Sequence, residues 1–506
     1  MTLKKIALLS AIGFALLNSV FADVKPNPMF SDNAVLQQGA EVPVWGTARD
    51  GETVTVEFQD QKATATAKDG KWMARLKNLK PGGPFSMTIK GDNAVTIANI
   101  LVGEVWLCSG QSNMEWGLAK SDGGAEAVAS SANPMLRMCR VPHNVQATPQ
   151  SEVKVKWEVS DPAVAKNFSA IPYWFGSKLQ KELGVPVGII NSAFGGTTIE
   201  SWLREETLKS GPWPHDKNTD LVQAKADYDR RVEEVRPIQE KYDADKAAAL
   251  AAKLPPPPRP KELFSEFKGP STLWNGEVVP LFPYQIRGVA WYQGESNAYA
   301  GRAGTYKDLL PALIKDWRAG FGQPDLPFMI FQIARNRKWQ VDANEKSGIA
   351  ELQEAQAKIA QATPHAALIV TTDMGGPDVH YTGKEPVADR ATKTALALAY
   401  DRKIECASPV FDSVKFQGGK AVVHFIKTGG GLEAKDGELA GFVIAGKDKK
   451  FVFADAKIDG DNLIVSSVQV PDPVAVRYGW ADLPKVNLFN KLGLPASTFR
   501  TDDWAL

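Results

Sequence analysis

A serine in a polar turn is the strongest chemical signal in this sequence. The segment CSGQSNMEW, residues 108–116, follows an apolar run, and Ser112 comes after a glycine and before helix-like sequence. In an open α/β sheet, ligands bind beyond the carboxyl ends of the strands, where such turns lie. A serine there, near a helix start, can use its own backbone N–H to stabilise an oxyanion. The alternative is that Ser112 only caps the helix.

Two more polar turns follow later apolar runs. The segment NSAFGGTTIESW, residues 191–202, contains paired glycines, which let the backbone approach a bound group closely. The segment WYQGESN, residues 291–297, presents Gln293, Glu295 and Asn297 together. The alternatives are an ordinary tight turn for the glycine pair and a strand-end side chain bonded to backbone for Gln293.

A fourth turn carries a histidine. His380 lies in DMGGPDVHYTGKEPVADR, residues 373–390, after the last expected strand of this region. Histidine is the usual general base for a serine nucleophile because its pKa is close to working pH. A carboxylate nearby would fix its tautomer, and Asp378 and Asp373 are both available. The alternative is a lone surface histidine.

The elements around these turns predict a parallel sheet covered by helices on both faces. Near-continuous apolar runs occur at residues 104–110, 136–142, 187–196, 286–295, 326–334 and 366–375. Amphipathic stretches lie between or after them, at residues 173–183, 306–319, 349–362 and 387–400. Apolar strands that alternate with helices are typical of an α/β fold.

The flanking regions have a different pattern. Short alternating segments broken by glycine predict an N-terminal β-sandwich over residues 23–100, and alternation returns in a C-terminal β-rich region, residues 403–506. The α/β domain between them spans 101–402. An insertion at about 214–262 is rich in Ala, Lys, Glu and Asp, is broken at Pro237 and ends in four prolines. It predicts a solvated helical hairpin or lid, more typical of a structural excursion than of a catalytic element.

Charge and cysteine content exclude several classes of function. With 506 residues, two or three domains are expected. Lysine plus arginine (59) nearly balances aspartate plus glutamate (58), and no basic stripe indicates nucleic-acid binding. Cys108 and Cys139 are expected as buried thiols, although one disulfide between them remains open. The spacing of cysteines and of the five histidines indicates no metal site, and no cofactor is expected.

The first 22 residues have the pattern of a secretory signal. Lys4 and Lys5 precede a mostly apolar run, and Val20-Phe21-Ala22 ends in small-x-small style. A membrane anchor is the alternative, but the run is short for a span. We expect cleavage after Ala22, a secreted or periplasmic location, and no membrane association afterwards.

Taken together, the four turns resemble the block order of the SGNH-hydrolase superfamily. GQSNMEW, FGGTTIESW, WYQGESN and DVHYTGKEPVADR occur in the order and at the spacings of the sialate O-acetylesterase family and related carbohydrate acetylesterases. The resemblance covers most of residues 101–402. It implies a three-layer, flavodoxin-like α/β domain with a mainly parallel sheet.

The resemblance also implies roles for individual residues. Ser112 is the nucleophile, His380 is the base, and the oxyanion hole is formed by the Ser112 N–H, Gly196 and Gln293. Gln111, Asn113 and Glu295 are expected to bind substrate. The sequence departs from the family pattern, because Pro377 stands where many members place the acid and Tyr381 replaces the usual proline. Asp378 is then the first choice for orienting His380, and Asp373 is the second.

The expected function is hydrolysis of O-acetyl groups on carbohydrates through an acetyl-serine intermediate, most of all on sialic acids. An acetylxylan or other polysaccharide esterase is the nearest alternative, and a non-catalytic carbohydrate-binding protein is a second. The expected partner is an O-acetylated sugar or glycan. The sequence indicates no oligomeric state.

Overall fold

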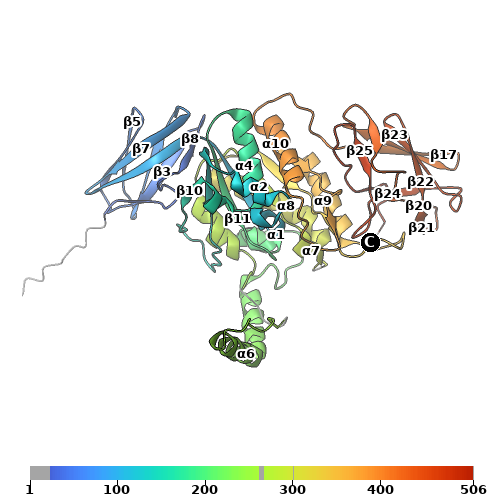
Figure 1. Ribbon diagram of the computed structural model, residues 1–506, viewed down its shortest axis with the longest axis horizontal. Helices are drawn as coiled ribbons and strands as arrows, with labels where there is room; N and C mark the ends of the chain where they lie inside the picture. Colours follow the sequence, from blue (N-terminus) through green and yellow to red (C-terminus); the bar gives the residue numbers. More distant parts are fainter. Residues whose placement is uncertain (1–22, 261–266, 300, 505–506) are drawn as a thin grey trace, which may run out of the picture.

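A mixed sheet forms the centre of the protein in the computed structural model, which describes residues 23–260, 267–299 and 301–504 (Figure 1). The predicted signal segment, residues 1–22, lies outside this range. The strand order is β10-β9-β11-β8-β12-β13-β15. All neighbouring pairs are parallel except β10 with β9. The strands span Trp157–Ser160 (β10), Asn133–Arg140 (β9), Val187–Ala193 (β11), Ala94–Gly110 (β8), Gly288–Tyr292 (β12), Phe328–Phe331 (β13) and Ala366–Ile369 (β15).

Helices cover both faces of this sheet, as the sequence predicts. Trp106 on β8 packs edge-to-face on Phe175 of one helix, and Trp291 on β12 packs on Trp317 of another. Trp291 is paired with Ser109, so it points to the opposite face from Trp106. The helices are α4 (Ala170–Leu183) and α10 (Glu385–Ala399), which pack together, and α8 (Ala303–Phe321) and α9 (Gly348–Ala362), which also pack together. The strands between them are almost wholly buried, which explains their continuous apolar sequence.

The strand order places several turns at one edge. β8 lies between β11 and β12, so the chain leaves β8 for one side of the sheet and later returns to its other side. The turns after β8, β11 and β12 therefore meet at the carboxyl end of the sheet, where open α/β sheets bind ligands. The residues in these turns belong to α1 (Ser112–Glu115), η2 (Ile199–Trp202) and α7 (Glu295–Tyr299).

The N-terminal β-rich region is joined to the central sheet by β8. This strand is 17 residues long; its first part pairs with β7 and β2, and its last part pairs with β11 and β12. A domain boundary between residues 100 and 101 therefore falls inside a strand. The other strands are β1 (Lys25–Pro26), β2 (Val35–Gln37), β3 (Val42–Thr47), β4 (Thr53–Phe58), β5 (Gln61–Thr66), β6 (Lys71–Leu76) and β7 (Gly82–Lys90).

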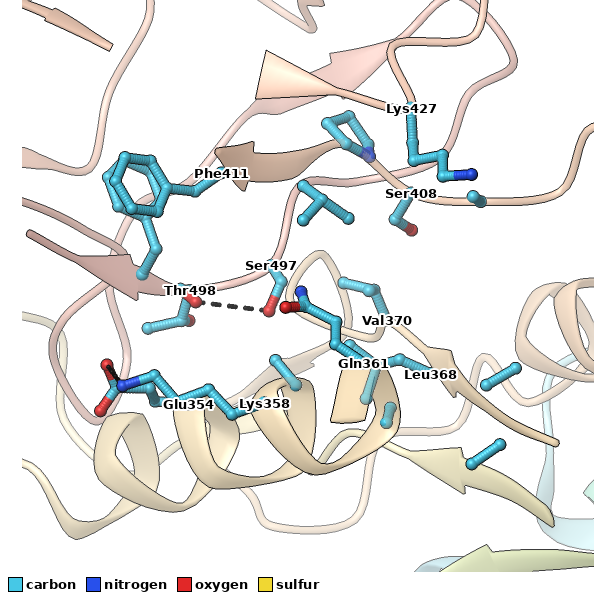
Figure 2. A pocket seen from close by; sticks show the side chains of 18 of the residues that line it. Glu354, Lys358, Gln361, Leu368, Val370, Ser408, Phe411, Lys427, Ser497 and Thr498 are labelled. Carbon is cyan, nitrogen blue, oxygen red and sulfur yellow. Dashed lines mark hydrogen bonds and ion pairs between the residues drawn. The ribbon is translucent and has the colours of Figure 1, made fainter. Parts of the chain in front are cut away.

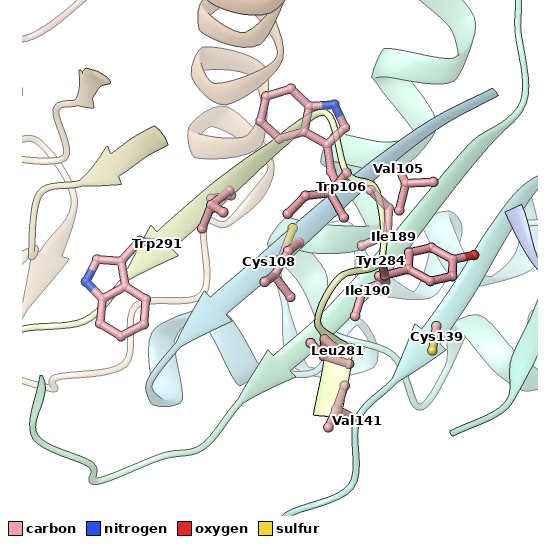
Figure 3. Packing of buried hydrophobic residues seen from close by; sticks show 14 of the residues in the cluster. Val105, Trp106, Cys108, Cys139, Val141, Ile189, Ile190, Leu281, Tyr284 and Trp291 are labelled. Atoms are coloured by element: carbon pink, nitrogen blue, oxygen red, sulfur yellow. The ribbon is translucent and has the colours of Figure 1, made fainter. Parts of the chain in front are cut away.

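One apolar core runs from this region into the central sheet. It includes side chains from β2 and β4 as well as those from β8, β11 and β12. Figure 3 shows Cys108 and Cys139 among these side chains. Both cysteines are free and buried, and β11 lies between their strands, so the disulfide left open by the sequence does not form. Their role is packing.

The insertion contains one long helix, α6 (Leu221–Ala251), which extends away from the body of the molecule (Figure 1). Contrary to the predicted break, the helix continues through Pro237. Proline removes one backbone donor, and ion pairs spaced four residues apart, such as Lys241 with Asp245 at 2.8 Å, support the exposed helix. Within the described part of the insertion there is no second helix to form a hairpin.

The C-terminal β-rich region has its own apolar core. It contacts the central domain through α9, where Thr498 Oγ1 donates to Gln353 Oε1 at 2.7 Å and Arg500 pairs with Glu354 at 3.1 Å. Its strands are β17 (Val410–Gln417), β18 (Lys420–Ile426), β19 (Leu432–Ala434), β20 (Phe442–Ala445), β21 (Phe451–Phe453), β22 (Asp455–Asp459), β23 (Asn462–Ser466), β24 (Ala475–Tyr478), β25 (Leu488–Asn490) and β26 (Phe499–Arg500).

The remaining elements are short. They are β14 (Arg335–Asn336), β16 (Gly375–Gly376), α2 (Gly124–Ala129), α3 (Pro162–Ala165), α5 (Glu205–Ser210), η1 (Leu118–Lys120), η3 (Trp274–Val278) and η4 (Val279–Leu281). Among the helices of the described ranges, none has the length and apolar character that crossing a bilayer requires.

Candidate active site

The turn after β8 holds Ser112 at the carboxyl edge of the sheet. Gly110 ends the strand with φ +136°, and a side chain there would lie 2.0 Å from the carbonyl oxygen of Tyr292 on β12. Glycine is therefore required for the two strand ends to approach this closely. Ser112 then begins α1, so its N–H is one of the helix-start donors that have no partner within the helix.

Ser112 and His380 form a hydrogen-bonded pair, although 268 residues separate them in sequence. His380 Nε2 lies 2.8 Å from Ser112 Oγ. The imidazole also stacks on Trp116 at 5.1 Å between ring centroids. Burial, helped by the charge of Lys384, lowers the pKa of His380, while Asp378 acts in the opposite direction. The ring is thus neutral at neutral pH and able to accept the serine proton.

Neither candidate carboxylate hydrogen-bonds to the His380 ring. Asp378 Oδ1 accepts the backbone N–H of His380 at 2.8 Å but lies 3.8 Å from Nδ1. Its side chain is 79% exposed. Asp373 is held in a two-point pair with Arg390, at 2.8 and 2.6 Å. Of the two carboxylates, only Asp378 therefore lies beside the His380 ring. It acts on the ring through its charge, because it is exposed and does not hydrogen-bond to Nδ1.

The glycine pair after β11 lies against the nucleophile. A Cβ on Gly195 would lie 3.1 Å from Ser112 Cβ, which is tighter than an ordinary contact, so the turn lies directly against the nucleophile. The Gly195 N–H donates to Glu115 Oε2 at 2.7 Å. Gly196 is exposed and has φ +71°. The predicted placement of the glycine turn beside Ser112 thus agrees with the structure.

Both ends of the Gln293 amide are bonded within the protein. It is fully buried, and its Nε2 lies 2.8 Å from Asn297 Oδ1, 3.0 Å from the Thr197 carbonyl and 3.2 Å from Gln111 Oε1. Its Oε1 accepts from the Tyr306 hydroxyl at 2.9 Å. An amide nitrogen has only two hydrogens, and both are used within the protein. Gln293 braces the turns that carry Ser112 and Gly196, and its role as an oxyanion donor stays a prediction.

Gln111, Asn113 and Glu295 also lie beneath the site and not in it. Their exposed fractions are 3%, 1% and 1%. Gln111 Oε1 accepts backbone N–H groups of Gly294 and Ser296, both at 3.2 Å, and Asn113 Nδ2 donates to Glu295 Oε1 at 2.5 Å. The protein itself covers these residues, so their predicted contact with substrate stays a prediction.

A partly exposed ion pair behind the glycine turn was not predicted from the sequence. His143 Nε2 lies 2.9 Å from Glu115 Oε1, and the imidazole stacks on Phe194 at 3.5 Å. The hydrogen bond that His143 donates to Glu115 raises the pKa of His143. Burial acts to raise the pKa of Glu115, but the hydrogen bonds from His143 and from the Gly195 N–H lower it. Glu115 lies within the serine motif, so the sequence could have singled it out. Its partner His143 follows β9, and the sequence does not show that β9 lies beside β11.

An open cavity of about 530 Å³ leads to the catalytic pair. Ser112, His380 and Trp116 line it together with three cationic side chains and one carboxylate: Arg140, Lys120, Lys166 and Glu115. Trp116 is the tryptophan of these motifs that borders the cavity, since Trp202 and Trp291 are fully buried. A cavity with this lining can hold a sugar against the aromatic ring and an anionic group against the cations.

A second cavity, of about 370 Å³, lies between α9, β15 and the C-terminal region (Figure 2). Its lining is mostly apolar, with Leu368, Val370 and Phe411 facing it. Ser408 and Ser497 are present, but no histidine lines the cavity. It is a gap in the seam between two regions and offers no equivalent of the Ser112–His380 pair. In the described residues, no group of His, Cys, Asp and Glu side chains is arranged to hold a metal ion.

Comparisons with known proteins agree with this geometry. A family model described as carbohydrate esterase, sialic acid-specific acetylesterase, matches residues 102–245 and 276–393. The sialate O-acetylesterase of Mus musculus is 28% identical over 403 residues, covering 71% of this chain and 70% of that protein. The enzyme of the same name from Homo sapiens is 28% identical over 434 residues, covering 78% and 74%.

A solved structure extends the similarity to nearly the whole chain. The crystal structure of a carbohydrate acetylesterase from Xanthomonas citri has a TM-score of 0.80 and 35% identity, and it covers 95% of this chain and 100% of that one. The matched family segments contain the turns of Ser112, Gly195, Gln293 and His380. The chain therefore belongs to the sialic acid-specific acetylesterase family of carbohydrate esterases, and it is a carboxylic ester hydrolase.

Proposed function

We propose that the protein is a serine esterase that removes O-acetyl groups from sialic acids, with Ser112 as nucleophile and His380 as general base. The observation that carries this proposal is the 2.8 Å contact between Ser112 Oγ and His380 Nε2 at the carboxyl edge of the sheet. Hydroxyl and imidazole are already within proton-transfer distance. Membership of the sialic acid-specific acetylesterase family indicates that the bond cleaved is an O-acetyl ester and that the sugar is a sialic acid.

The reaction proceeds in two steps. His380 Nε2 takes the hydroxyl proton as Ser112 Oγ attacks the acetyl carbon, and the protonated imidazole then gives that proton to the departing sugar oxygen. Water attacks the acetyl-serine next; its proton passes to His380 and then to Ser112 Oγ, which releases acetate. In both steps the backbone N–H groups of Ser112 and Gly196 stabilise the oxyanion. No hydrogen bond within the described residues uses either of these two groups.

The strand order supports an SGNH-type domain for the central region. Without the edge strands β10 and β9, the order β11-β8-β12-β13-β15 is 2-1-3-4-5 in chain sequence, the flavodoxin-like pattern. We propose this domain for about 101–402, with β8 shared with the N-terminal region. The composition of residues 1–22 supports export to the periplasm or the outside of the cell.

The cations beside the catalytic pair favour an acidic sugar over a neutral one. Arg140, Lys120 and Lys166 line the same cavity as Ser112 and His380, where Glu115 is the one carboxylate, so positive charge is in excess. The carboxylate of a sialic acid has the charge and the flat shape that a guanidinium recognises. The neutral sugars of acetylated xylan offer no charge to these cations, and a non-catalytic sugar-binding protein would not need the serine–histidine contact.

The test compares a charged sialate ester with its uncharged methyl ester and with a neutral polysaccharide ester. Acetate release is measured from 9-O-acetyl sialic acid, from its carboxyl methyl ester and from acetylated xylan, with wild type and Arg140→Gln. We expect wild type to prefer the free acid, and Arg140→Gln to lose about tenfold or more in kcat/KM on the acid alone, as for a charge-assisted contact. Equal or better activity on acetylated xylan would overturn the sialate assignment.

A further inference from the structure

One side-chain amide links the neighbours of the nucleophile and of the base. Asn113, next to Ser112 in sequence, donates through Nδ2 to Glu295 Oε1 at 2.5 Å and to the Val379 carbonyl at 3.2 Å. Its Oδ1 accepts from Lys384 Nζ at 2.6 Å. Val379 directly precedes His380, so this amide connects the two turns that must bring Ser112 and His380 together.

The chemistry of the partners fixes the amide in one orientation. A carboxylate accepts hydrogen bonds and an ammonium donates them, so Asn113 must present its nitrogen to Glu295 and its oxygen to Lys384. With that orientation fixed, the second N–H points to the Val379 carbonyl. A reversed amide would oppose oxygen to oxygen at Glu295 and lose the bond that holds the histidine loop.

The two charged partners are buried on either side of this amide. The exposed fraction is 0% for Lys384 and 1% for Glu295, and Lys384 Nζ lies 3.5 Å from the centroid of the Tyr381 ring. Burial lowers the pKa of Lys384 to about 7 and raises the pKa of Glu295. A buried ion is costly without its partner, so the two groups are needed together.

We propose that Lys384 is a positioning residue that, through Asn113, locks the histidine loop to the nucleophile turn, and that Glu295 sets the direction of this lock. The inference rests on the proposed roles of Ser112 and His380. A purely structural role would make these residues matter for folding but not for turnover of the folded enzyme. A positioning role makes the distance between the reacting groups depend on them.

The first test replaces the ammonium by an apolar side chain of similar length. In purified, folded Lys384→Met, kcat for 4-nitrophenyl acetate should fall about 10- to 100-fold, as expected for a small misplacement of reacting groups. KM should stay within about twofold, because the side chain is buried and does not touch the ester. Unchanged kcat would overturn the proposal.

The pH profile supplies a readout that a structural role would not move. The groups around His380 are the Ser112 hydroxyl, the Trp116 ring, Asp378 and Lys384. The positive charge of Lys384 lowers the pKa of His380, and Lys384 is mostly protonated over the acid limb because its pKa is about 7. Lys384→Met should therefore move the acid limb of kcat/KM to higher pH.

The second test keeps or removes the hydrogen-bond acceptor that residue 295 offers to Asn113 Nδ2. Glu295→Gln retains a carbonyl oxygen for Asn113 Nδ2, whereas Glu295→Leu has the same bulk and no acceptor. We expect Glu295→Gln to be at least about tenfold more active than Glu295→Leu, which leaves the amide without direction. Equal activity of the two variants would contradict the proposed role of Glu295. This pair also decides the matter if Lys384→Met does not fold.

The matched control is a buried ion pair far from the site. Arg477 pairs with Asp502 at 2.7 Å in the C-terminal region, where both side chains are at least nine-tenths buried. Arg477→Met should lower Tm and leave kcat of the folded enzyme unchanged. Ser112→Ala is measured alongside these variants. If it keeps its activity, the proposed mechanism itself is refuted. If it is inactive and Lys384→Met has unchanged kcat, only the proposed role of Lys384 fails.

Discussion

The nucleophile turn and the histidine loop contribute one reacting group each, but they are built differently. The turn after β8 is surrounded by buried polar side chains: Gln111, Asn113 and Gln293 are all at most 3% exposed and bonded on several sides. The histidine loop, between β15 and α10, is partly exposed, and Asp378 is 79% exposed.

The difference shows where the geometry of the site is determined. The nucleophile turn is fixed by its own surroundings, since the Asn113 and Gln293 amides each have partners in two or more segments. His380 is held from the nucleophile side, by the Trp116 ring and by the bond from Asn113 to the Val379 carbonyl. Substitutions around the nucleophile turn should therefore displace both Ser112 and His380. Substitutions at the exposed end of the histidine loop should change the activity little.

The largest effect should come from the nucleophile itself. Ser112→Ala should leave Tm nearly unchanged, because Ser112 is only half-buried and contributes no bond to the turn other than the one with His380. Esterase activity should fall by about 10⁴–10⁶, as for the loss of a serine nucleophile. Steady-state rates on 4-nitrophenyl acetate test this. A folded variant with near wild-type turnover would remove Ser112 from the mechanism.

Gln293→Ala should have the next largest effect. The substitution removes the brace between the Gln111 side chain and the Thr197 carbonyl, so both oxyanion turns can shift. We expect kcat to fall about 10- to 100-fold together with a lower Tm. Gln353→Ala is the control: it is equally buried but bonds the C-terminal region, so it should lower Tm and keep kcat. The same loss of kcat in both variants would show a general loss of structure.

The pH dependence of wild type should follow His380. Its pKa is lowered by burial, so the base remains unprotonated below the ordinary value of 6.5. Activity should rise with pH along an acid limb whose midpoint lies below about 6.5. A kcat/KM profile from pH 4.5 to about 8 measures this. A midpoint above 6.5 would mean that a nearby negative charge outweighs burial.

The smallest effect should come from Asp378. Because its carboxylate is exposed and 3.8 Å from Nδ1, Asp378→Asn should cost less than about tenfold in kcat, against about 10⁴ for a buried triad acid. The charge of Asp378 raises the pKa of His380, so its removal should move the acid limb to lower pH. A loss near 10⁴ would show that Asp378 closes onto the ring during turnover. Asp373→Asn should act on Tm, through Arg390.

Much of this arrangement could be predicted from the sequence, because the strands are buried on both faces and carry unbroken apolar runs. The runs at 187–196, 286–295 and 366–375 contain β11, β12 and β15, and the turns after them meet at one edge. Ser112 and His380 were predicted because each lies in a polar turn after such a run. Their contact confirms that they are brought together.

The direction of polar side chains was not predictable. Gln293 and Glu295 follow a strand end in the sequence, yet their side chains turn inward to bond neighbouring loops. The Glu115–His143 pair joins segments whose proximity depends on strand order. The predicted break at Pro237 was wrong, because a single proline costs a helix one hydrogen bond and does not always end it.

The long strand β8 also determines how the chain can be divided. Its 17 residues serve both the N-terminal region and the central sheet, and one apolar core spans the two. A truncated protein that begins at residue 101 would start inside this strand, exposing Leu101 and Val102 and leaving the central sheet without its first partners. We therefore expect these two regions to melt in one cooperative transition, with the C-terminal region and its separate core as the part that can melt independently.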